Sequence, residues 1–163
     1  TTGQTEAERQ SIKDASAVIP VFYSANMSLG IAVLCDLAKK AASFFPDADI
    51  EIVEKHHDQK LDVPSGTALL LADAIKEVRE DAVYNIGRHE NGKRTKQEIG
   101  IHSLRMGTEV GTHEIYIHNG SECITLTHEA ESRAVFAQGA VKAAEFIIKQ
   151  KPGLYNMHDL VGD

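Results

Sequence analysis

The spacing of apolar residues predicts helices and strands in alternation over the first half of the chain. Apolar side chains recur at intervals of three and four in residues 29–45 and 68–80, which is typical of helices. In residues 29–45 they occur on almost every side, so we expect that helix to be buried on more than one face. Short apolar runs at residues 19–23 and 50–54 predict strands, the first of them buried.

The pattern changes to a period of two in the second half. Apolar and polar residues alternate over three segments, which predicts strands at residues 99–104, 113–118 and 123–127. Asn119-Gly120 between the last two strands predicts a two-residue hairpin. Residues 81–96 show no periodicity and are expected to be irregular, whereas residues 133–150 have helical spacing again.

Polar residues mark where the helices begin. Thr5 and Glu8 have the spacing of a capping box, which predicts a surface helix over residues 6–17. Ser28 and Ser132 stand at N-cap positions before the second and the last helix. The pattern as a whole predicts an α+β fold, with a mixed or antiparallel sheet that has helices on one face.

Composition narrows the class of protein. The chain has 163 residues, is 42% hydrophobic and carries a net charge of −7, which fits a globular domain and argues against a nucleic-acid-binding surface. Lys93, Arg94 and Lys96 form the one short basic cluster, which we interpret as a solvated turn. No apolar run reaches the roughly 18 residues of a membrane span, and no signal peptide is visible, so we expect a cytoplasmic protein.

The two cysteines do not indicate redox or metal chemistry. Cys35 lies in an apolar helical run and Cys123 in a strand-like run, without the spacing of a zinc knuckle or a redox pair. We therefore expect two free, buried thiols in a reducing compartment.

The segment that follows the strand at residues 50–54 carries the candidate chemistry. His56 and Lys60 lie four residues apart between a strand and a helix, where α/β proteins commonly place functional groups. A histidine side chain can exchange a proton near neutral pH, and a lysine supplies a fixed positive charge for an anion. These two residues are candidates for proton transfer and for anion binding.

Residues 64–67, Pro-Ser-Gly-Thr, open the next predicted helix. The free N–H groups and the positive dipole end of a helix N-terminus, flanked here by two hydroxyls, form a cradle for a carboxylate or a phosphate. Taken alone, the same residues could be a simple helix cap. His56 and His57 could also bind a metal together with His102 or His128, although the charge of Lys60 opposes this. We favour a site without metal.

Residues 56–68, HHDQKLDVPSGTA, preceded by Glu54, resemble the signature of the dihydrodipicolinate reductase family, also called 4-hydroxy-tetrahydrodipicolinate reductases. That family's pattern is a Glu shortly before a His-His pair, then a Lys, then Asp-x-Pro-Ser-Gly-Thr-Ala. Further similar segments extend the resemblance over essentially the whole chain: residues 1–3, 24–28, 101–111, 128–133 and 153–157.

The resemblance implies an enzyme that uses NADH or NADPH to reduce a cyclic imine dicarboxylate in lysine and diaminopimelate biosynthesis. It implies that His56 is the general acid and that Lys60 assists it. It assigns the binding of the substrate carboxylates to His57, Lys60, Ser65, Gly66 and Thr67. It places beside the nicotinamide Thr1, Thr2, Gly3, Ser24, Ala25, Asn26 and Met27, and more loosely Arg133 and Phe136. It also implies a homotetramer.

One part of the family pattern is absent from this sequence. It contains no glycine-rich GxGxxG run for a pyrophosphate, and it begins with a threonine inside a family motif. We therefore expect residues 1–26 to be a remnant of an α/β Rossmann-type dinucleotide-binding domain and residues 27–151 to be the substrate-binding and oligomerisation domain. Residues 152–163 would be a return segment that packs on the dinucleotide-binding domain. The hypothesis is that the chain is an excised piece of a longer protein.

Two other functions stay open on the sequence alone. The chain could be a non-catalytic assembly module, in which only the sheet matters. It could also be a phosphate-binding protein built on the cradle of residues 65–67. Phosphate would then stabilise it, whereas a dicarboxylate would not.

Overall fold

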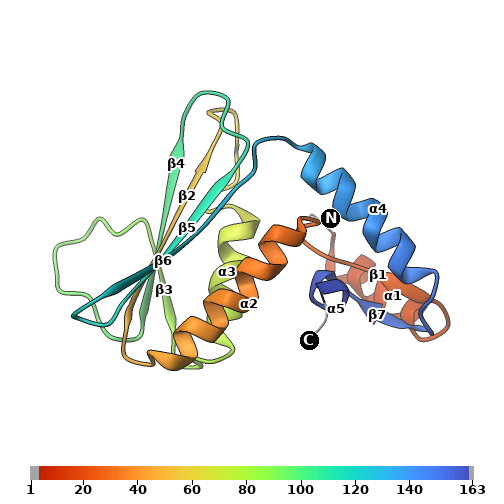
Figure 1. Ribbon diagram of the computed structural model, residues 1–163, viewed down its shortest axis with the longest axis horizontal. Helices are drawn as coiled ribbons and strands as arrows, with labels where there is room; N and C mark the ends of the chain where they lie inside the picture. Colours follow the sequence, from red (N-terminus) through yellow and green to blue (C-terminus); the bar gives the residue numbers. More distant parts are fainter. Residues whose placement is uncertain (1–3, 162–163) are drawn as a thin grey trace. The chain divides into compact units, whose positions relative to one another are not determined.

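The computed structural model describes residues 4–161 (Figure 1). The predicted cofactor contacts at Thr1, Thr2 and Gly3 lie outside the described residues. The chain divides into two compact units: unit 1 combines the residues up to Val33 with those from Arg133 onward, and unit 2 runs from Leu34 to Ser132. The domain limits drawn from the sequence, at residues 27 and 151, stay a prediction.

Five helices and seven strands are assigned within the described residues. The helices are α1 (Glu6–Ser16), α2 (Leu29–Phe44), α3 (Gly66–Lys76), α4 (Ala134–Ile147) and α5 (Met157–Val161). The strands are β1 (Pro20–Phe22), β2 (Asp49–His56), β3 (Val83–Ile86), β4 (Glu98–Arg105), β5 (Thr112–His118), β6 (Cys123–Glu129) and β7 (Gly153–Tyr155).

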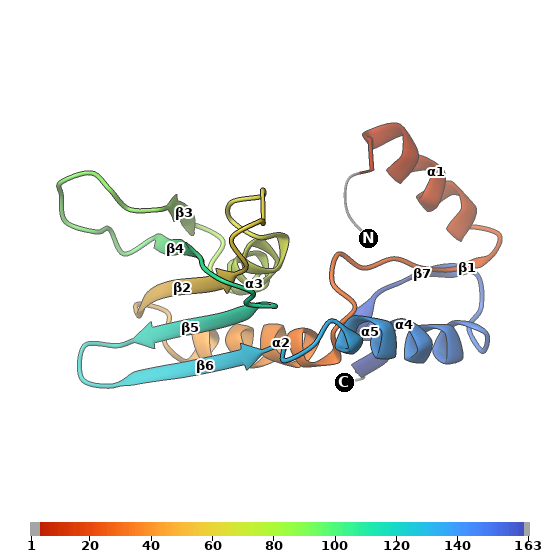
Figure 2. The ribbon, with the colours of Figure 1, turned by 90° about the horizontal axis from the view of Figure 1, so that it is seen from above.

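Unit 2 is built on a five-stranded mixed sheet in the order β3-β4-β2-β5-β6. Strand β4 runs parallel to β2 and β3, while β5 runs antiparallel to β2 and β6. Helix α3 and the main part of α2 cover one face of this sheet (Figures 1 and 2). The α+β fold with a mixed sheet and helices on one face is therefore confirmed.

The core of unit 2 lies between this sheet face and the two helices. Side chains on β2 alternate between the faces, and every second one is buried: Ile50, Ile52, Glu54 and His56. Isoleucines of β4 and β5 extend the same layer: Ile99, Ile101, Ile115 and Ile117. Burying one such side chain contributes about 1.5–3 kcal/mol. The last two buried positions of β2 are polar, so the apolar layer leads directly into a polar cluster.

The opposite face of the sheet carries ion pairs instead of a core. Lys55 Nζ lies 2.7 Å from a carboxylate oxygen of Glu114. His102 Nε2 lies 2.9 Å from Glu51, whose carboxylate crosses the strand at Gly100, where a side chain would overlap it. This face is partly exposed to solvent.

Unit 1 is held together by two segments that are distant in the sequence. Strand β1 pairs in parallel with β7, and the Tyr23 N–H donates to the Tyr155 carbonyl at 2.7 Å. The ring of Phe146 on α4 makes edge contacts with Phe22 and Tyr155, at centroid distances of 6.2 and 5.7 Å. The strand predicted at residues 19–23 is present as β1, but it is half-buried, so the prediction that it is buried is wrong.

The predicted helix caps are largely confirmed. Thr5 Oγ1 accepts the Glu8 N–H at 3.3 Å, and the Glu8 carboxylate accepts the Thr5 N–H at 2.7 Å, which completes the capping box. Ser28 Oγ accepts the Ile31 N–H at 3.3 Å. The last helix differs, because its N-cap is Arg133 and not Ser132.

Two local predictions are corrected by strand pairing. Strand β3 lies in the stretch expected to be irregular, because its backbone pairs with the edge of β4 although its own side chains show no alternation. The hairpin turn is displaced by one residue. The Asn119 N–H donates to the Glu122 carbonyl at 3.1 Å, so Gly120, with a positive φ of 100°, and Ser121 form the turn.

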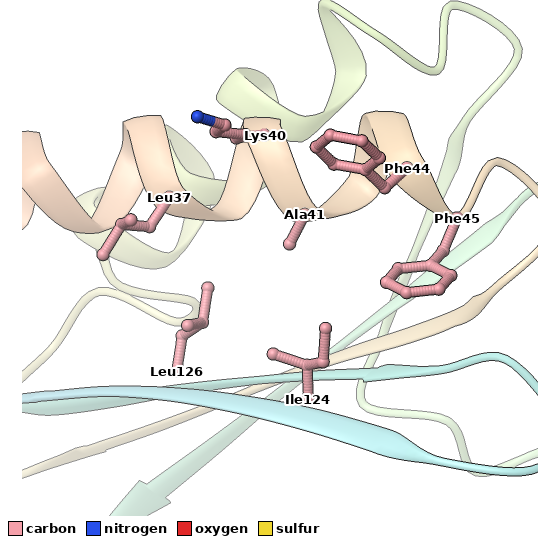
Figure 3. Close-up of a pocket in the computed structure, with 7 residues that line it drawn as sticks. All are labelled: Leu37, Lys40, Ala41, Phe44, Phe45, Ile124 and Leu126. Carbon is pink, nitrogen blue, oxygen red and sulfur yellow. The ribbon is translucent and has the colours of Figure 1, made fainter.

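Helix α2 is less buried than its composition predicts. Cys35 and Ala38 are fully buried, but Leu37 and Phe44 are 48% and 72% exposed. Together with Ile124 and Leu126 of β6 and three further α2-side residues, they line an apolar groove of about 480 Å³ (Figure 3). We call this the α2–β6 groove. Its seven lining residues are Leu37, Lys40, Ala41, Phe44, Phe45, Ile124 and Leu126.

Cys35 is free and buried as predicted, whereas Cys123 is exposed because β6 is an edge strand. Over residues 4–161, no helix has the length and hydropathy needed to span a bilayer.

Candidate active site

The candidate site begins at the carboxyl end of strand β2. Glu54 and His56 are two residues apart on that strand, so both side chains point to the helix-covered face. Glu54 is fully buried and His56 is 8% exposed. A buried carboxylate must be compensated by charge and hydrogen bonds.

Four donors surround the Glu54 carboxylate. Its Oε2 lies 2.5 Å from His56 Nδ1 and accepts Arg105 Nη1 at 2.9 Å. Its Oε1 accepts Arg105 Nη2 at 2.8 Å and the backbone N–H of Ser65 at 3.1 Å. Arg105 thus forms a bidentate pair with Glu54, and the same carboxylate joins the end of β2 to the start of α3.

These contacts determine the charge of Glu54. Burial by itself would raise the pKa of this carboxyl group, but the hydrogen bonds from His56 and Arg105 outweigh burial, and the pKa lies far below its usual range. Glu54 is therefore an anion near neutral pH.

A second histidine packs against the first. The rings of His56 and His113, on neighbouring strands, meet edge to face at a centroid distance of 5.2 Å. His113 Nε2 lies 3.2 Å from Ser65 Oγ. Burial, followed by the charge of His56, lowers the pKa of His113 to about 3, so His113 is neutral near pH 7.

A glycine leaves room for the outer edge of the His56 ring. A Cβ atom on Gly111 would lie 3.0 Å from His56 Nε2, closer than ordinary side-chain contacts. Any residue other than glycine would therefore press on the ring nitrogen that does not face Glu54.

The loop after β2 brings Lys60 to the same region. Lys60 Nζ pairs with the Asp62 carboxylate at 2.8 Å, and its charge also acts on His113. Burial by itself would raise the pKa of Asp62. The contacts with Lys60 and with the Gly66 N–H lower it, and the net result is a decrease. An incoming anion would have to share Lys60 with Asp62.

Helix α3 begins as the sequence predicts. Ser65 is the N-cap, and its Oγ accepts the Ala68 N–H at 3.2 Å. Gly66 is exposed, and apart from its chain neighbours and the backbone of its own helix no atom lies within 4 Å of where its Cβ would stand. The open space at the first turn, together with the helix dipole, suits an anion.

Unit 2 thus brings together most of the predicted site. His56 and Ser65 meet through Glu54 and His113, while His57, Lys60, Gly66 and Thr67 lie on the loop and helix start beside them. The roles of these residues as acid and as substrate ligands stay predictions. The described part of the chain contains no cluster of three His, Cys, Asp or Glu side chains arranged to hold a metal. His102 projects from the opposite face of the sheet.

The other predicted cofactor contacts belong to unit 1. Residues 24–27 form a polar loop after β1, in which Ser24 Oγ donates to the Asn26 carbonyl at 2.7 Å. Helix α4 approaches this loop so closely that a Cβ on Gly139 would overlap the Met27 carbonyl oxygen. A loop at the carboxyl end of a parallel strand fits one end of a dinucleotide. Arg133 and Phe136 are in unit 1 as well.

Four residues of the site were not given a role from the sequence. Arg105, His113 and Gly111 contact His56 or Glu54 but are about 50 residues distant from them in the chain. The Glu-x-His spacing on a strand was the available signal for Glu54, because residues i and i+2 share a face.

The fold and the site define an α+β domain in which a buried histidine–carboxylate pair lies next to the N-terminus of a helix. The chain belongs to the dihydrodipicolinate reductase family, because the family model "Dihydrodipicolinate reductase, C-terminus" matches residues 30–161.

Named relatives agree with this assignment. The chain is 54% identical to 4-hydroxy-tetrahydrodipicolinate reductase of Caldanaerobacter subterraneus subsp. tengcongensis, over 99% of this chain and 65% of the relative. The enzyme of the same name from Clostridium novyi is 48% identical, with the same coverage of both chains. The solved structure of dipicolinate-bound dihydrodipicolinate reductase from Paenisporosarcina sp. TG-14 superposes with a TM-score of 0.76 at 29% identity, over 98% of this chain and 62% of that one. The chain thus spans about two thirds of the length of these relatives.

Proposed function

We propose that this chain is the substrate-binding and proton-donating part of a reductase that converts 4-hydroxy-tetrahydrodipicolinate to tetrahydrodipicolinate in lysine and diaminopimelate biosynthesis. The observation that carries the proposal is the meeting of His56, paired with Glu54, and the open N-terminus of α3 in one unit. The names of the relatives, and the dipicolinate bound to the Paenisporosarcina enzyme, support the same chemistry.

The groups of this chain divide the work as follows. The N–H groups at the first turn of α3, Thr67 and Lys60 would hold the substrate carboxylates. NADH or NADPH would supply the hydride when bound, with its nicotinamide beside residues 24–27. Negative charge that develops on the substrate ring would be neutralised by a proton from His56 Nε2, because Nδ1 is engaged by Glu54. Since the sequence has no glycine-rich loop, we assign no group here to the pyrophosphate.

A ligand test on this chain distinguishes the three candidate functions. We expect pyridine-2,6-dicarboxylate to raise the melting temperature, corresponding to about 2.7 kcal/mol at a concentration of about 100 times Kd. Stabilisation by inorganic phosphate and not by the dicarboxylate would favour a phosphate-binding protein. Stabilisation by neither would favour an assembly module.

A kinetic test uses the protein expressed from the complete reading frame. We expect His56→Ala to reduce kcat by about 10²–10⁴-fold, the usual contribution of a general acid, with little change in dicarboxylate binding. Lys60→Ala should lower kcat and also weaken the binding of the dicarboxylate. Turnover of the His56→Ala variant within a few fold of the wild type would show that His56 is not the acid.

We also propose that the protein assembles as a homotetramer through unit 2. Strand β6 is an edge with an unpaired side, and the apolar α2–β6 groove lies between this strand and α2 (Figure 3). A second copy of this chain would pair with that edge and cover the groove. We expect Phe44→Asp to reduce the mass measured by light scattering, whereas Val18→Asp, an exposed apolar position in unit 1, should not. A tetrameric Phe44→Asp variant would exclude the groove from the interface.

A further inference from the structure

The Glu54 carboxylate has more contacts with the site than a structural ion pair requires. Two of these donors are the nitrogens of Arg105, and the others are the imidazole of His56 and the N-cap backbone of α3. A single buried anion is thus bonded to the candidate acid and to the backbone of the anion cradle.

The geometry determines which nitrogen of His56 carries a proton in the neutral ring. Glu54 is an acceptor only, because its carboxyl group is ionised, so the 2.5 Å contact requires a hydrogen on Nδ1. The neutral ring then has a bare Nε2, which lies on the side of Gly111. Proton exchange with a substrate is limited to that atom.

We infer that Glu54 is a positioning residue for the reaction: it holds His56 as the Nδ1–H tautomer with Nε2 as the proton-donating atom, and Arg105 clamps Glu54 in that orientation. This inference rests on the proposed function. Arg105 is suited to the clamp because it also donates to the Asp62 and Leu104 carbonyls, at 2.8 and 2.7 Å, and is thereby fixed between β4 and the loop after β2.

Charged and titratable groups from three strands and one loop surround the Glu54–His56 pair. Glu54 contacts His56 on the same strand, β2, and Arg105 on β4 contacts Glu54. Lys60 lies in the loop that follows β2. His113 on β5 is neutral, and His128 is its partner on β6, with a pKa also lowered by burial.

Glu54→Gln is the sharpest substitution because it keeps the shape and removes the charge. Arg105 would hold the amide oxygen, so the amide NH₂ would face His56 and select the Nε2–H tautomer. In serine protease triads the equivalent carboxylate-to-amide change lowers kcat by about 10⁴-fold through the wrong tautomer. We expect a loss of at least about 10-fold in kcat, the lower end of the effect for partners that orient a histidine at a metal site.

The first readout is the tautomer of His56, measured from ¹⁵N shifts of the imidazole in this chain without catalysis. We expect Nδ1–H in the wild type and Nε2–H in Glu54→Gln. A wild-type Nε2–H form, or no change on substitution, would overturn the inference. This result is independent of whether the protein is a reductase.

The second readout is the pH profile of kcat for the protein expressed from the complete reading frame. The limb on which activity falls as pH rises should move to lower pH in Glu54→Gln, because the protonated imidazole loses its anion, with the KM for the dicarboxylate within a few fold. An unshifted limb would show that Glu54 is only structural. If the wild type has no reductase activity, the proposed function fails, and the tautomer result still decides the role of Glu54.

Two further variants separate the positioning role from folding. The double variant Glu54→Gln/Arg105→Met removes both charges together, so no guanidinium is left unpaired. Because the Ser65 N–H donates to the same oxygen as Arg105, the amide NH₂ should still face His56, and the kinetic defect should remain. Recovery of kcat with an unchanged Nε2–H tautomer would instead attribute the loss to the unpaired charge of Arg105. The matched control is Glu51→Gln. Glu51 is on the same strand as Glu54 but on the opposite face of the sheet, and its carboxylate lies 2.9 Å from His102. This substitution should leave the His56 tautomer unchanged.

Discussion

The neutral, buried His113 makes the stability of unit 2 depend on pH. Its ring is 3% exposed, contacts His56 and faces Ser65 Oγ, and burial is the main reason that its pKa falls to about 3. The pKa in the folded state is lowered relative to the unfolded chain. The unfolded chain therefore binds a proton first as the pH falls, and stability is lost below the unfolded pKa of about 6.5.

The size of the effect follows from the two pKa values. With about 3 in the folded state and about 6.5 in the unfolded state, the free energy of unfolding should decrease by about 2 kcal/mol between about pH 7 and about pH 5. Glu54 does not contribute in this range, since a carboxyl group with a lowered pKa loses its stabilising effect only below about pH 4.5. His128 adds a loss of the same sign.

The assay is urea unfolding followed by circular dichroism at several pH values. The His113→Gln variant should be less stable at about pH 7 but should lose about 2 kcal/mol less than the wild type on acidification to about pH 5. His118→Gln, at the exposed end of the same strand, is the control. Its free energy of unfolding should fall with decreasing pH as steeply as that of the wild type. Equal slopes for the wild type and His113→Gln would refute the reasoning.

Two other substitutions have clear expected outcomes. Gly139→Ala should destabilise unit 1 by about 1–3 kcal/mol in thermal unfolding, because the new methyl group would displace the Met27 carbonyl, although alanine ordinarily favours a helix; a stabilised variant would show that α4 does not press on this loop. Asp62→Asn should lower the Kd for pyridine-2,6-dicarboxylate several-fold in calorimetry, because Lys60 no longer has an internal anion. Asp58→Asn is its control, and weaker binding to the Asp62→Asn variant would mean that Asp62 orients Lys60 for the ligand.

The sequence predicted those parts of the fold that depend on local pattern. The strands β2, β4, β5 and β6 and the four long helices follow from periodicity and caps. Strand β3 was missed because its structure depends on the neighbouring β4 and not on its own side chains. The exposure of Leu37 and Phe44 was missed because helical spacing does not reveal which apolar side a neighbouring element covers.

The site was predicted where it is contiguous in sequence and missed where it is not. Residues 56–67 form a single loop and helix start, so their chemistry was visible in the sequence. The Glu54–Arg105 pair depends on the parallel register of β2 and β4, which places His56 opposite Arg105. No local rule predicts which of several strands will lie beside β2.

The pairing of β1 with β7 has a consequence for the order of folding. All strand pairs of unit 2 lie within residues 49–129, whereas Pro20 pairs with Gly153, so unit 1 requires contacts that span nearly the whole chain. Domains fold as units during synthesis, and contacts between distant segments form late. On the ribosome, the sheet of unit 2 and the segment that carries His56 can therefore be folded before β7, the partner of β1, has been translated.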